Sequence, residues 1–475
     1  MQRALTPEPT PQPSLDTPLY PPTVRPPDRD LPFLFYVAKL VANPLRVMPK
    51  AVYTDPIVAY SFLNTHLFWV TAPELIERVL LEETGRYVKS PLERRVLGPT
   101  LGDGMLTAQM DTWRWQRKVA SPLFRHADLL AFVPAMAAAA ETQIARWREH
   151  SGGSAPFTTD AEAAMMTVTF DIIATTVLAG CEPAEGVAIK RADTAYMDPI
   201  SWEITAAVLK LPGWVWHPAQ RQMREAASTL RGAVATIIER RRGEIGSAMG
   251  APADDLLARL LAARDPETGA PMSDTMMVDN LTTFLEAGHQ TTAQALSWAL
   301  YLLARAPAWQ DAARAEIANA VGEEAIEGRH VASLPVTLRI FKEAMRLYPP
   351  VPAILRLAKE ADQLGDEAIP AGAIVIIPVY AAHRHHARWD DPDRFDPDRF
   401  LPDREQERPR AQYLPFGFGP RTCLGMPFAY LEGVAILASV LRRCRFSWDG
   451  RHVPEPLSQI TLHPKGGMPL KVELI

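Results

Sequence analysis

The sequence predicts a large, mainly helical protein with a small β region, built as a single domain. Apolar residues recur at helical spacing over long segments, namely 128–150, 159–180, 219–248 and 273–305. Segments with strand character are short and few. Nothing in the middle of the 475-residue chain has the composition of a linker, and 47% hydrophobic with 22% charged residues suits one extensive core.

Proline dominates the start of the chain. Ten prolines lie within the first 32 residues, so we expect residues 1–32 to form an extended, partly disordered arm and residues 33–475 to form the domain. The apolar stretch 31–38 ends at Lys39, far short of the ~20 residues that a bilayer span requires. A short helix packed on the protein is the favoured interpretation, with contact to a membrane surface as the alternative. We expect no stable membrane insertion.

The next elements follow from local signals. Residues 66–70 predict a strand, Pro73 opens a helix, and residues 111–123 form another helix. The segment 211–218 predicts a loop whose tryptophans are exposed, typical of a flap or lid.

A long helix follows in the second half of the chain. Ser273 is placed to cap it and Pro307 to stop it after Arg305, which gives a length of roughly 45 Å. Twelve prolines between 335 and 420 predict a long irregular but ordered segment. Helix resumes after Cys423 to Leu441, and the sequence predicts strands at 460–462 and 470–474.

Charge and cysteine content narrow the function classes. A net charge of -5 and a pI near 6.2 argue against general nucleic-acid binding. Cys181, Cys423 and Cys444 are too few for a disulfide framework, an iron–sulfur cluster or an all-cysteine zinc site, so a reducing cytoplasm is expected. The sequence has no glycine-rich phosphate loop, so we expect no built-in reductase.

The chemistry is concentrated in Phe416-Gly-Phe-Gly-Pro-Arg-Thr-Cys-Leu-Gly425. Its glycines let the backbone approach a flat, bulky group. Cys423 lies where a helix begins, and helix N–H groups favour a thiolate. Arg421 can bind a carboxylate. A buried cysteine in a glycine-rich turn would explain Cys423 alone, but not the residues at set offsets around it.

This loop resembles the haem-binding loop of the cytochrome P450 superfamily, and the chain is similar to its soluble bacterial members from about residue 35 to the end. The resemblance implies haem b as cofactor, Cys423 as the iron ligand, and a mostly helical haem-thiolate fold. It places four further residues around the cofactor, Phe416, Gly417, Arg421 and Gly425.

Other family signatures follow in the expected order. Glu343-x-x-Arg346 with Arg399 resembles the ion-pair triad on the proximal side of the haem. The resemblance also implies that three residues bind the haem propionates: Trp113, Arg117 and Arg356. On the oxygen side, Ala287-Gly-His-Gln-Thr291 resembles the Ala-Gly-x-(Asp or Glu)-Thr signature.

Each residue of the oxygen-side signature has an expected role. Gly288 would leave room for O2, and Thr291 could bond the Ala287 carbonyl and, by resemblance, hold O2 and help deliver protons. Gln290 departs from the family, because an amide cannot cycle a proton at neutral pH. O2 activation could be slow or poorly coupled, water could take over the relay, or Gln290 could replace a natural Glu.

The resemblance implies a monooxygenase that hydroxylates a lipophilic small molecule, such as a fatty acid or terpenoid, with O2 and electrons from a separate ferredoxin-type donor and its reductase. Substrate contacts are expected from Phe284, the 88–106 loop, 351–355 and the turn at 460–462. A donor-docking patch is expected from five cations: Arg114, Lys118, Arg125, Arg442 and Arg443.

Three alternatives remain open at the level of sequence. One is a peroxide-driven or isomerising haem-thiolate enzyme, which Gln290 keeps in view. A second is a non-catalytic haem sensor or carrier. The third is a zinc hydrolase that would use the histidines of 383–386.

Overall fold

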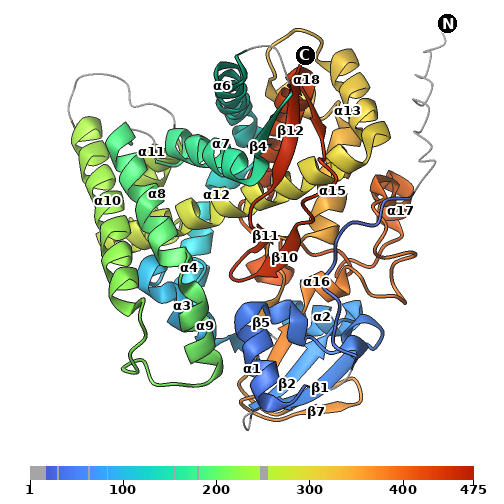
Figure 1. Cartoon of the computed structure of the whole chain (residues 1–475). Helices are drawn as coiled ribbons and strands as arrows, with labels where there is room; N and C mark the ends of the chain where they lie inside the picture. Colours follow the sequence, from blue (N-terminus) through green and yellow to red (C-terminus); the bar gives the residue numbers. More distant parts are fainter. Residues whose placement is uncertain are drawn as a thin grey trace, which may run out of the picture.

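The computed structural model describes residues 18–28, 31–62, 65–82, 84–152, 156–178, 181–246 and 255–475. Helices make up most of these residues and surround several small sheets (Figure 1). The predicted fold class, mainly helical with a small β region, is confirmed.

The helices range from single turns to a span of the whole molecule. In chain order they are α1 Phe33–Ala42, α2 Pro73–Glu77, α3 Pro91–Leu101, α4 Met110–Ala120, α5 His126–Leu129, α6 Val133–Ser151, α7 Ala161–Thr176, α8 Pro183–Met197, α9 Ile200–Val208, α10 Gln220–Gly246, α11 Leu256–Ala262, α12 Asp274–Arg305, α13 Pro307–Ala320, α14 Gly328–Val331, α15 Pro335–Leu347, α16 Val379–Ala382, α17 Pro402–Gln406 and α18 Met426–Arg443.

The strands are short. They are β1 Ile57–Phe62, β2 Thr65–Val70, β3 Tyr87–Lys89, β4 Phe157–Asp160, β5 Ile354–Ala358, β6 Asp362–Leu364, β7 Glu367–Ile369, β8 Ile374–Ile377, β9 Cys444–Ser447, β10 Glu455–Ser458, β11 Leu462–Lys465 and β12 Pro469–Leu474. The largest sheet has the order β1-β2-β8-β5-β3, and a second joins β4, β12 and β9. In the first sheet β2 and β8 run parallel, with Leu67 opposite Ile374.

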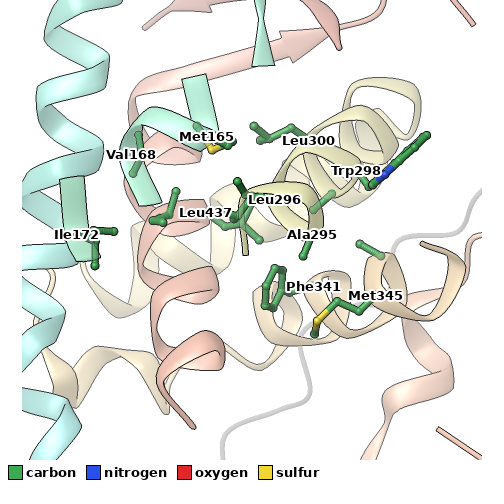
Figure 2. Close-up of a cluster of buried hydrophobic side chains, with 14 of the residues drawn as sticks. Met165, Val168, Ile172, Ala295, Leu296, Trp298, Leu300, Phe341, Met345 and Leu437 are labelled. Atoms are coloured by element: carbon green, nitrogen blue, oxygen red, sulfur yellow. The ribbon is translucent and has the colours of Figure 1, made fainter. Parts of the chain in front are cut away.

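Helix α12 is the axis of the fold and crosses the molecule from side to side (Figure 1). The Ser273 hydroxyl accepts a hydrogen bond from the Met276 N–H, and Pro307 opens the next helix, so both predicted ends are confirmed. Figure 2 shows apolar side chains of α7, α15 and α18 packed around α12. Farther along α12, the Trp298 ring stacks on Tyr348 with centroids 3.7 Å apart. This packing holds the central turns of α12 in place.

The part of the N-terminal arm that the structure describes, residues 18–28, is extended and without helix, as predicted. It is nevertheless packed into the body. Leu19 and Val24 are buried in the main core, and the Tyr348 hydroxyl donates to the Pro22 carbonyl at 2.8 Å. Residues 1–17 lie outside the described residues, and the domain boundary at 32/33 stays a prediction.

Several predicted elements differ from the structure. Segment 128–150 divides into α5, a 3-10 turn and α6, and the expected 88–106 loop is mostly the helix α3. The strand predicted at 460–462 is wrong except for Leu462, which begins β11: a tight turn closed by a hydrogen bond from the Gln459 N–H to the Thr461 carbonyl separates β10 from β11, as the expected turn implied. The strand at 470–474 is confirmed within β12.

No single helix among the described residues is both long and apolar enough to cross a bilayer. Segments 110–124 and 126–151 reach that length and composition only as a pair, bent by 57°.

Candidate functional site

The loop around Cys423 is a tight reversal of the chain that only glycine permits. The Cys423 N–H donates to the Phe416 carbonyl at 2.9 Å, and Gly417 and Gly419 both have positive φ, 73° and 74°. A Cβ on Gly419 would lie 2.2 Å from the carbonyl oxygen of Leu80. The loop therefore packs against the backbone at Leu80. Both the positive φ and this close approach require glycine at position 419.

The Cys423 side chain is exposed although the protein encloses it, which indicates an internal space at the sulfur. Helix α18 begins just after it, with Pro427 in the first turn as predicted. Burial raises the pKa of the Cys423 thiol, and the N–H groups of Gly425 and Met426 with the charge of Arg117 only partly offset this. The N–H groups at the helix start do favour the thiolate, as expected, but burial outweighs them; a bound metal cation would deprotonate the thiol.

The oxygen-side turn of α12 lies across from this loop. Phe284 and Leu424 pack against one cluster formed by Met105, Ala108 and Trp113. Ala287 is exposed, although Leu285 and Glu286 just before it are buried. Ala287 and Cys423 are therefore exposed side chains next to the two residues, Phe284 and Leu424, that this cluster joins.

Within this turn, the Thr291 hydroxyl donates to the Ala287 carbonyl at 2.8 Å, as the sequence predicts. Gln290 is half-buried. Gly288 also lies close to α7: a Cβ there would lie 2.7 Å from Cδ1 of Ile173.

Arg356, Arg421 and Trp113 gather at one edge of the internal space and are here called the cationic pole. Arg356 on β5, Arg421 and Trp113 line one pocket, and the Arg421 guanidinium carbon lies 4.5 Å from the Trp113 ring centroid. Nη1 of Arg421 is buried without a hydrogen-bond partner among the described residues. Burial and the charge of Arg356 lower the pKa of Arg421 to about 10.

Among the described residues, no carboxylate forms an ion pair with Arg117, Arg356 or Arg421. The charge of Glu93 acts on Arg356 and Arg421, but Glu93 itself pairs with Lys89. Buried cations without anions are costly, so the pole fits an acidic group supplied from outside the chain, as a cofactor with two carboxylates would provide. The donor set therefore fits haem.

Arg117 is only partly where the sequence analysis expected it. One turn after Trp113 on α4, its Nη1 donates to the Thr422 carbonyl at 2.8 Å. Its charge also acts on the Cys423 thiol. The structure thus brings Trp113, Arg356 and Arg421 together and points Arg117 at the cysteine loop.

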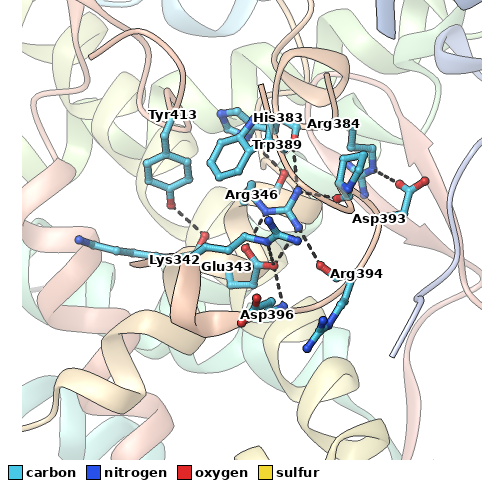
Figure 3. Close-up of polar contacts among 12 residues, drawn as sticks. Lys342, Glu343, Arg346, His383, Arg384, Trp389, Asp393, Arg394, Asp396 and Tyr413 are labelled. Atoms are coloured by element: carbon cyan, nitrogen blue, oxygen red, sulfur yellow. Dashed lines mark hydrogen bonds and ion pairs between the residues drawn. The ribbon is translucent and has the colours of Figure 1, made fainter. Parts of the chain in front are cut away.

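The Glu343 triad is assembled as predicted (Figure 3). Arg346 donates to Glu343 through Nε at 2.6 Å and Nη2 at 2.8 Å, and Nε of Arg399 lies 3.5 Å from the same carboxylate. Arg346 also binds three backbone carbonyls, those of His383, Pro392 and Arg394, at 2.8, 2.7 and 3.0 Å. The triad therefore anchors the proline-rich segment that leads to Cys423.

The contacts of His383 argue against the zinc hydrolase alternative. Nε2 of His383 accepts from the Leu414 N–H at 2.9 Å and Nδ1 lies 3.2 Å from the Arg346 carbonyl, so both ring nitrogens are used. Burial lowers the pKa of His383 well below its usual value. Over the described part of the chain, no three His, Cys, Asp or Glu side chains gather as a metal site.

The expected donor-docking patch is wrong in part. Arg442 and Arg443 lie at the far end of α18, roughly 25 Å along the helix from its start, and pair with Glu141 and Glu323. On α4, Lys118 pairs with Glu267 at 2.7 Å. Arg114 pairs with Asp111 and Arg125 is exposed.

Two buried acids near the oxygen-side turn were not among the predicted site residues. Glu432 on α18 is fully buried, neither of its carboxyl oxygens has a hydrogen-bond partner among the described residues, and burial raises its pKa to about 8. Glu286 on α12 faces Asp193 of α8. The sequence shows that Glu286 directly precedes the oxygen-side signature and that Glu432 follows the Cys423 loop. It does not show that either acid is buried.

A thiol at the start of a long helix, facing a threonine-bearing helix turn across an internal space with a cationic edge, defines the class of haem-thiolate proteins. A sequence model of the family described as "Cytochrome P450" matches residues 25–470. The chain belongs to the cytochrome P450 family. It is therefore a monooxygenase-type oxidoreductase with haem b as its cofactor.

Several relatives match along most of their length. Cyclooctatin synthase of Streptomyces melanosporofaciens is 30% identical over 89% of each chain. Cytokinin hydroxylase of Arabidopsis thaliana is 29% identical, over 84% of this chain and 77% of its own. The haem domain of cytochrome P450DA superposes with a TM-score of 0.77 at 24% identity, covering 89% of this chain and 90% of that one, which shows the fold alone.

Proposed function

We propose that the protein hydroxylates a lipophilic small molecule, with the Cys423 thiolate as the protein's ligand to the haem iron. The observation that carries the site assignment is the group of arginines beside the Cys423 loop, in which Arg356 is buried and Nη1 of Arg421 has no hydrogen-bond partner among the described residues. In this assignment Arg356, Arg421, Trp113 and Arg117 hold the propionate groups. Phe416, Gly417 and Gly425 shape the loop that the macrocycle contacts.

When bound, haem b activates O2 so that one oxygen atom can enter a C–H bond of the substrate. The chain supplies the surroundings of that reaction. The Thr291 hydroxyl can release the Ala287 carbonyl and donate a hydrogen bond into the internal space. Gln290 can orient a water beside Thr291 but cannot itself exchange a proton at neutral pH.

The proposed substrate is a fatty acid, terpenoid or similar lipophile. Segment 88–106 and Ile460 contribute apolar side chains to one cluster with α8, α9 and α10, and Met105 connects to Phe284. The Leu462 N–H donates to the Pro350 carbonyl at 2.9 Å, which brings β11 next to 351–355. Apolar walls with few polar groups favour a lipophile over a sugar or nucleotide.

Electrons are proposed to come from a ferredoxin-type donor and its reductase, and the protein to act in the cytoplasm. The lack of a phosphate-binding loop in the sequence supports a separate donor. With Arg442 and Arg443 excluded, the docking patch reduces to Arg114, Lys118 and Arg125. Reduction rates should fall with ionic strength and with charge reversal at Arg125; rates indifferent to both would contradict this docking surface.

A second candidate is a peroxide-driven or isomerising haem-thiolate enzyme, and the amide at Gln290 is the observation that favours it. Turnover with peroxide alone that equals or exceeds turnover with O2 and a reduced donor would establish that alternative. A carbon monoxide difference spectrum, followed by a spectral screen of lipophilic compounds, tests the principal proposal. Absence of any spectral shift with fatty acids and terpenoids would remove the proposed substrate class.

A further inference from the structure

Beside the oxygen-side turn, three titratable side chains meet in the interior. Glu286 and His289 lie on α12, and Asp193 comes from α8. All three are buried, with 8%, 3% and 7% of their surfaces exposed. None of the three belongs to the Cys423 loop, to the cationic pole or to the hydrogen bond between Thr291 and Ala287.

Both ring nitrogens of His289 face acceptors. Nδ1 lies 2.7 Å from the Leu285 carbonyl, and Nε2 lies 3.4 Å from Oδ2 of Asp193. A carbonyl oxygen never donates, so Nδ1 must carry a proton, and an ionised Asp193 then demands a second proton on Nε2. The imidazolium form of His289 satisfies both contacts.

The two carboxyl groups require another proton. Oδ1 of Asp193 and Oε1 of Glu286 are buried and lack a donor among the described residues as long as both groups are ionised. Each of the two carboxyl groups nevertheless acts on the pKa of the other. A proton on Glu286 turns this repulsive pair into a hydrogen bond.

The electrostatics assign that proton to Glu286. Burial and the charge of Asp193 raise the pKa of Glu286 well above its usual value. Burial alone would raise the pKa of Asp193, but the hydrogen bonds and charge of His289 and a hydrogen bond from Glu286 bring it below the usual value. Neutral Glu286, anionic Asp193 and cationic His289 together carry no net charge.

Aromatic rings and hydroxyl groups surround the three residues, and the charge of Glu286 also acts on the buried Tyr196 of α8. The Phe170 ring of α7 packs edge-on to His289 at 5.7 Å, and the Thr169 hydroxyl donates to the His289 carbonyl at 2.9 Å. Lys190 of α8 lies over the same Phe170 ring at 4.3 Å and pairs with Asp171. Thus α7 presents an aromatic ring and a hydroxyl, and α8 presents Asp193 with Lys190 beyond the ring.

We infer that Asp193 is a positioning residue, which holds a protonated His289 and a protonated Glu286 and so clamps the turn 286–291 of α12 to α8. The consequence for Gln290 and Thr291 rests on the proposed function, since both follow His289 directly in the chain. The family usually has a carboxylate at 290. Here the charge next to that position is a histidine cation whose carboxylate partner comes from another helix.

The test measures the His289 ring directly. In the haem-loaded protein with 15N-labelled histidine, the His289→Gln variant assigns its ring signals. We expect both nitrogens of His289 to be protonated at pH 7.5. In Asp193→Asn, the proton affinity of the ring should fall roughly 10- to 100-fold, because a charge-assisted contact is lost. A neutral ring in the wild type, or a ring unaffected by Asp193→Asn, would overturn the inference.

A matched control comes from α7. Glu162→Gln neutralises a half-buried carboxyl that binds α12, since Gln294 donates to Glu162 at 2.8 Å, but it touches no member of the clamp. Peroxide released per reduced cofactor should rise several-fold in Asp193→Asn and stay unchanged in Glu162→Gln. Equal leakage in both variants would refute the positioning role. If the protein proves not to be a monooxygenase, the protonation of His289 still tests the clamp.

Asp193→Asn could also loosen the fold, so a double variant separates charge from packing. In Asp193→Asn with His289→Gln, two amides replace the charged pair and no buried charge is left alone. Leakage should fall back toward the wild-type value. Leakage in the double variant equal to the sum of the single effects would contradict a paired role.

Discussion

Arg346 donates through Nε to Oε2 of Glu343 at 2.6 Å, and both side chains are completely buried. Glu343 also accepts the Asp396 N–H at 2.8 Å (Figure 3). The pair therefore links α15 to the irregular segment that leads to the Cys423 loop. Its strength bears on cofactor retention as well as on folding.

Glu343→Gln should destabilise the protein by roughly 3–5 kcal/mol, because the Arg346 cation would remain buried without its anion. Urea unfolding at pH 7 measures this loss, and haem content after purification should fall with it. The control is Asp311→Asn, which breaks the exposed pair with Arg445 and should cost under about 1 kcal/mol. Similar losses in both variants would show that the triad has no special role.

Replacement of the proposed ligand gives a spectral prediction. Cys423→Ala should abolish the thiolate-type carbon monoxide band, whereas Cys181→Ala and Cys444→Ala should keep it. Cys444 is fully buried and its thiol pKa is raised to about 12, so it is a core thiol rather than a ligand. A band that persists in Cys423→Ala and vanishes in Cys444→Ala would reverse the assignment.

Glu432 should make stability depend on pH. Its folded-state pKa of about 8 lies above the ordinary 4.5, so the folded protein favours the protonated carboxyl. That contribution is fully present below pH 4.5 and is lost as pH rises through about 8. Glu432→Gln cannot titrate, so from pH 5 to pH 9 its unfolding free energy should gain several kcal/mol relative to wild type. Parallel pH profiles would show that Glu432 titrates normally.

Elements set by local chemistry could be predicted from the sequence. Ser273 and Pro307 bound α12 because a cap and a proline act on their own turns. The hydrogen bond of Thr291 to Ala287 follows from their spacing within one helix. The i,i+3 spacing of Glu343 and Arg346 likewise predicted that both side chains lie on one helix face.

What could not be predicted depends on partners distant in the chain. Gly288 lies close to Ile173 of α7, and the clamp needs Asp193, nearly a hundred residues before His289. The hydrogen bond from Arg117 to the Thr422 carbonyl likewise depends on a residue 305 positions later in the chain. Helical periodicity shows which face is buried, not which neighbour covers it.

Gln290 is the position where the chain departs from the family pattern, and it gives the last prediction. If protons reach Thr291 through position 290, Gln290→Glu should restore an ionisable group there. Product formed per reduced cofactor should then rise and peroxide release should fall, by about 2- to 10-fold. Thr291→Ala should raise peroxide release in the same assay.

The same substitution places a carboxylate next to the His289 cation, which bears on its outcome. That cation favours the ionised form of the introduced carboxyl group, whereas burial favours the neutral form, so coupling should be measured from pH 6 to pH 9. A working relay adds a titration to the pH profile that Gln290→Asn, a non-ionisable control, lacks. Coupling and peroxide release unchanged from the wild type at every pH would show that water, rather than residue 290, carries the proton, and Thr291→Ala would then have a smaller effect.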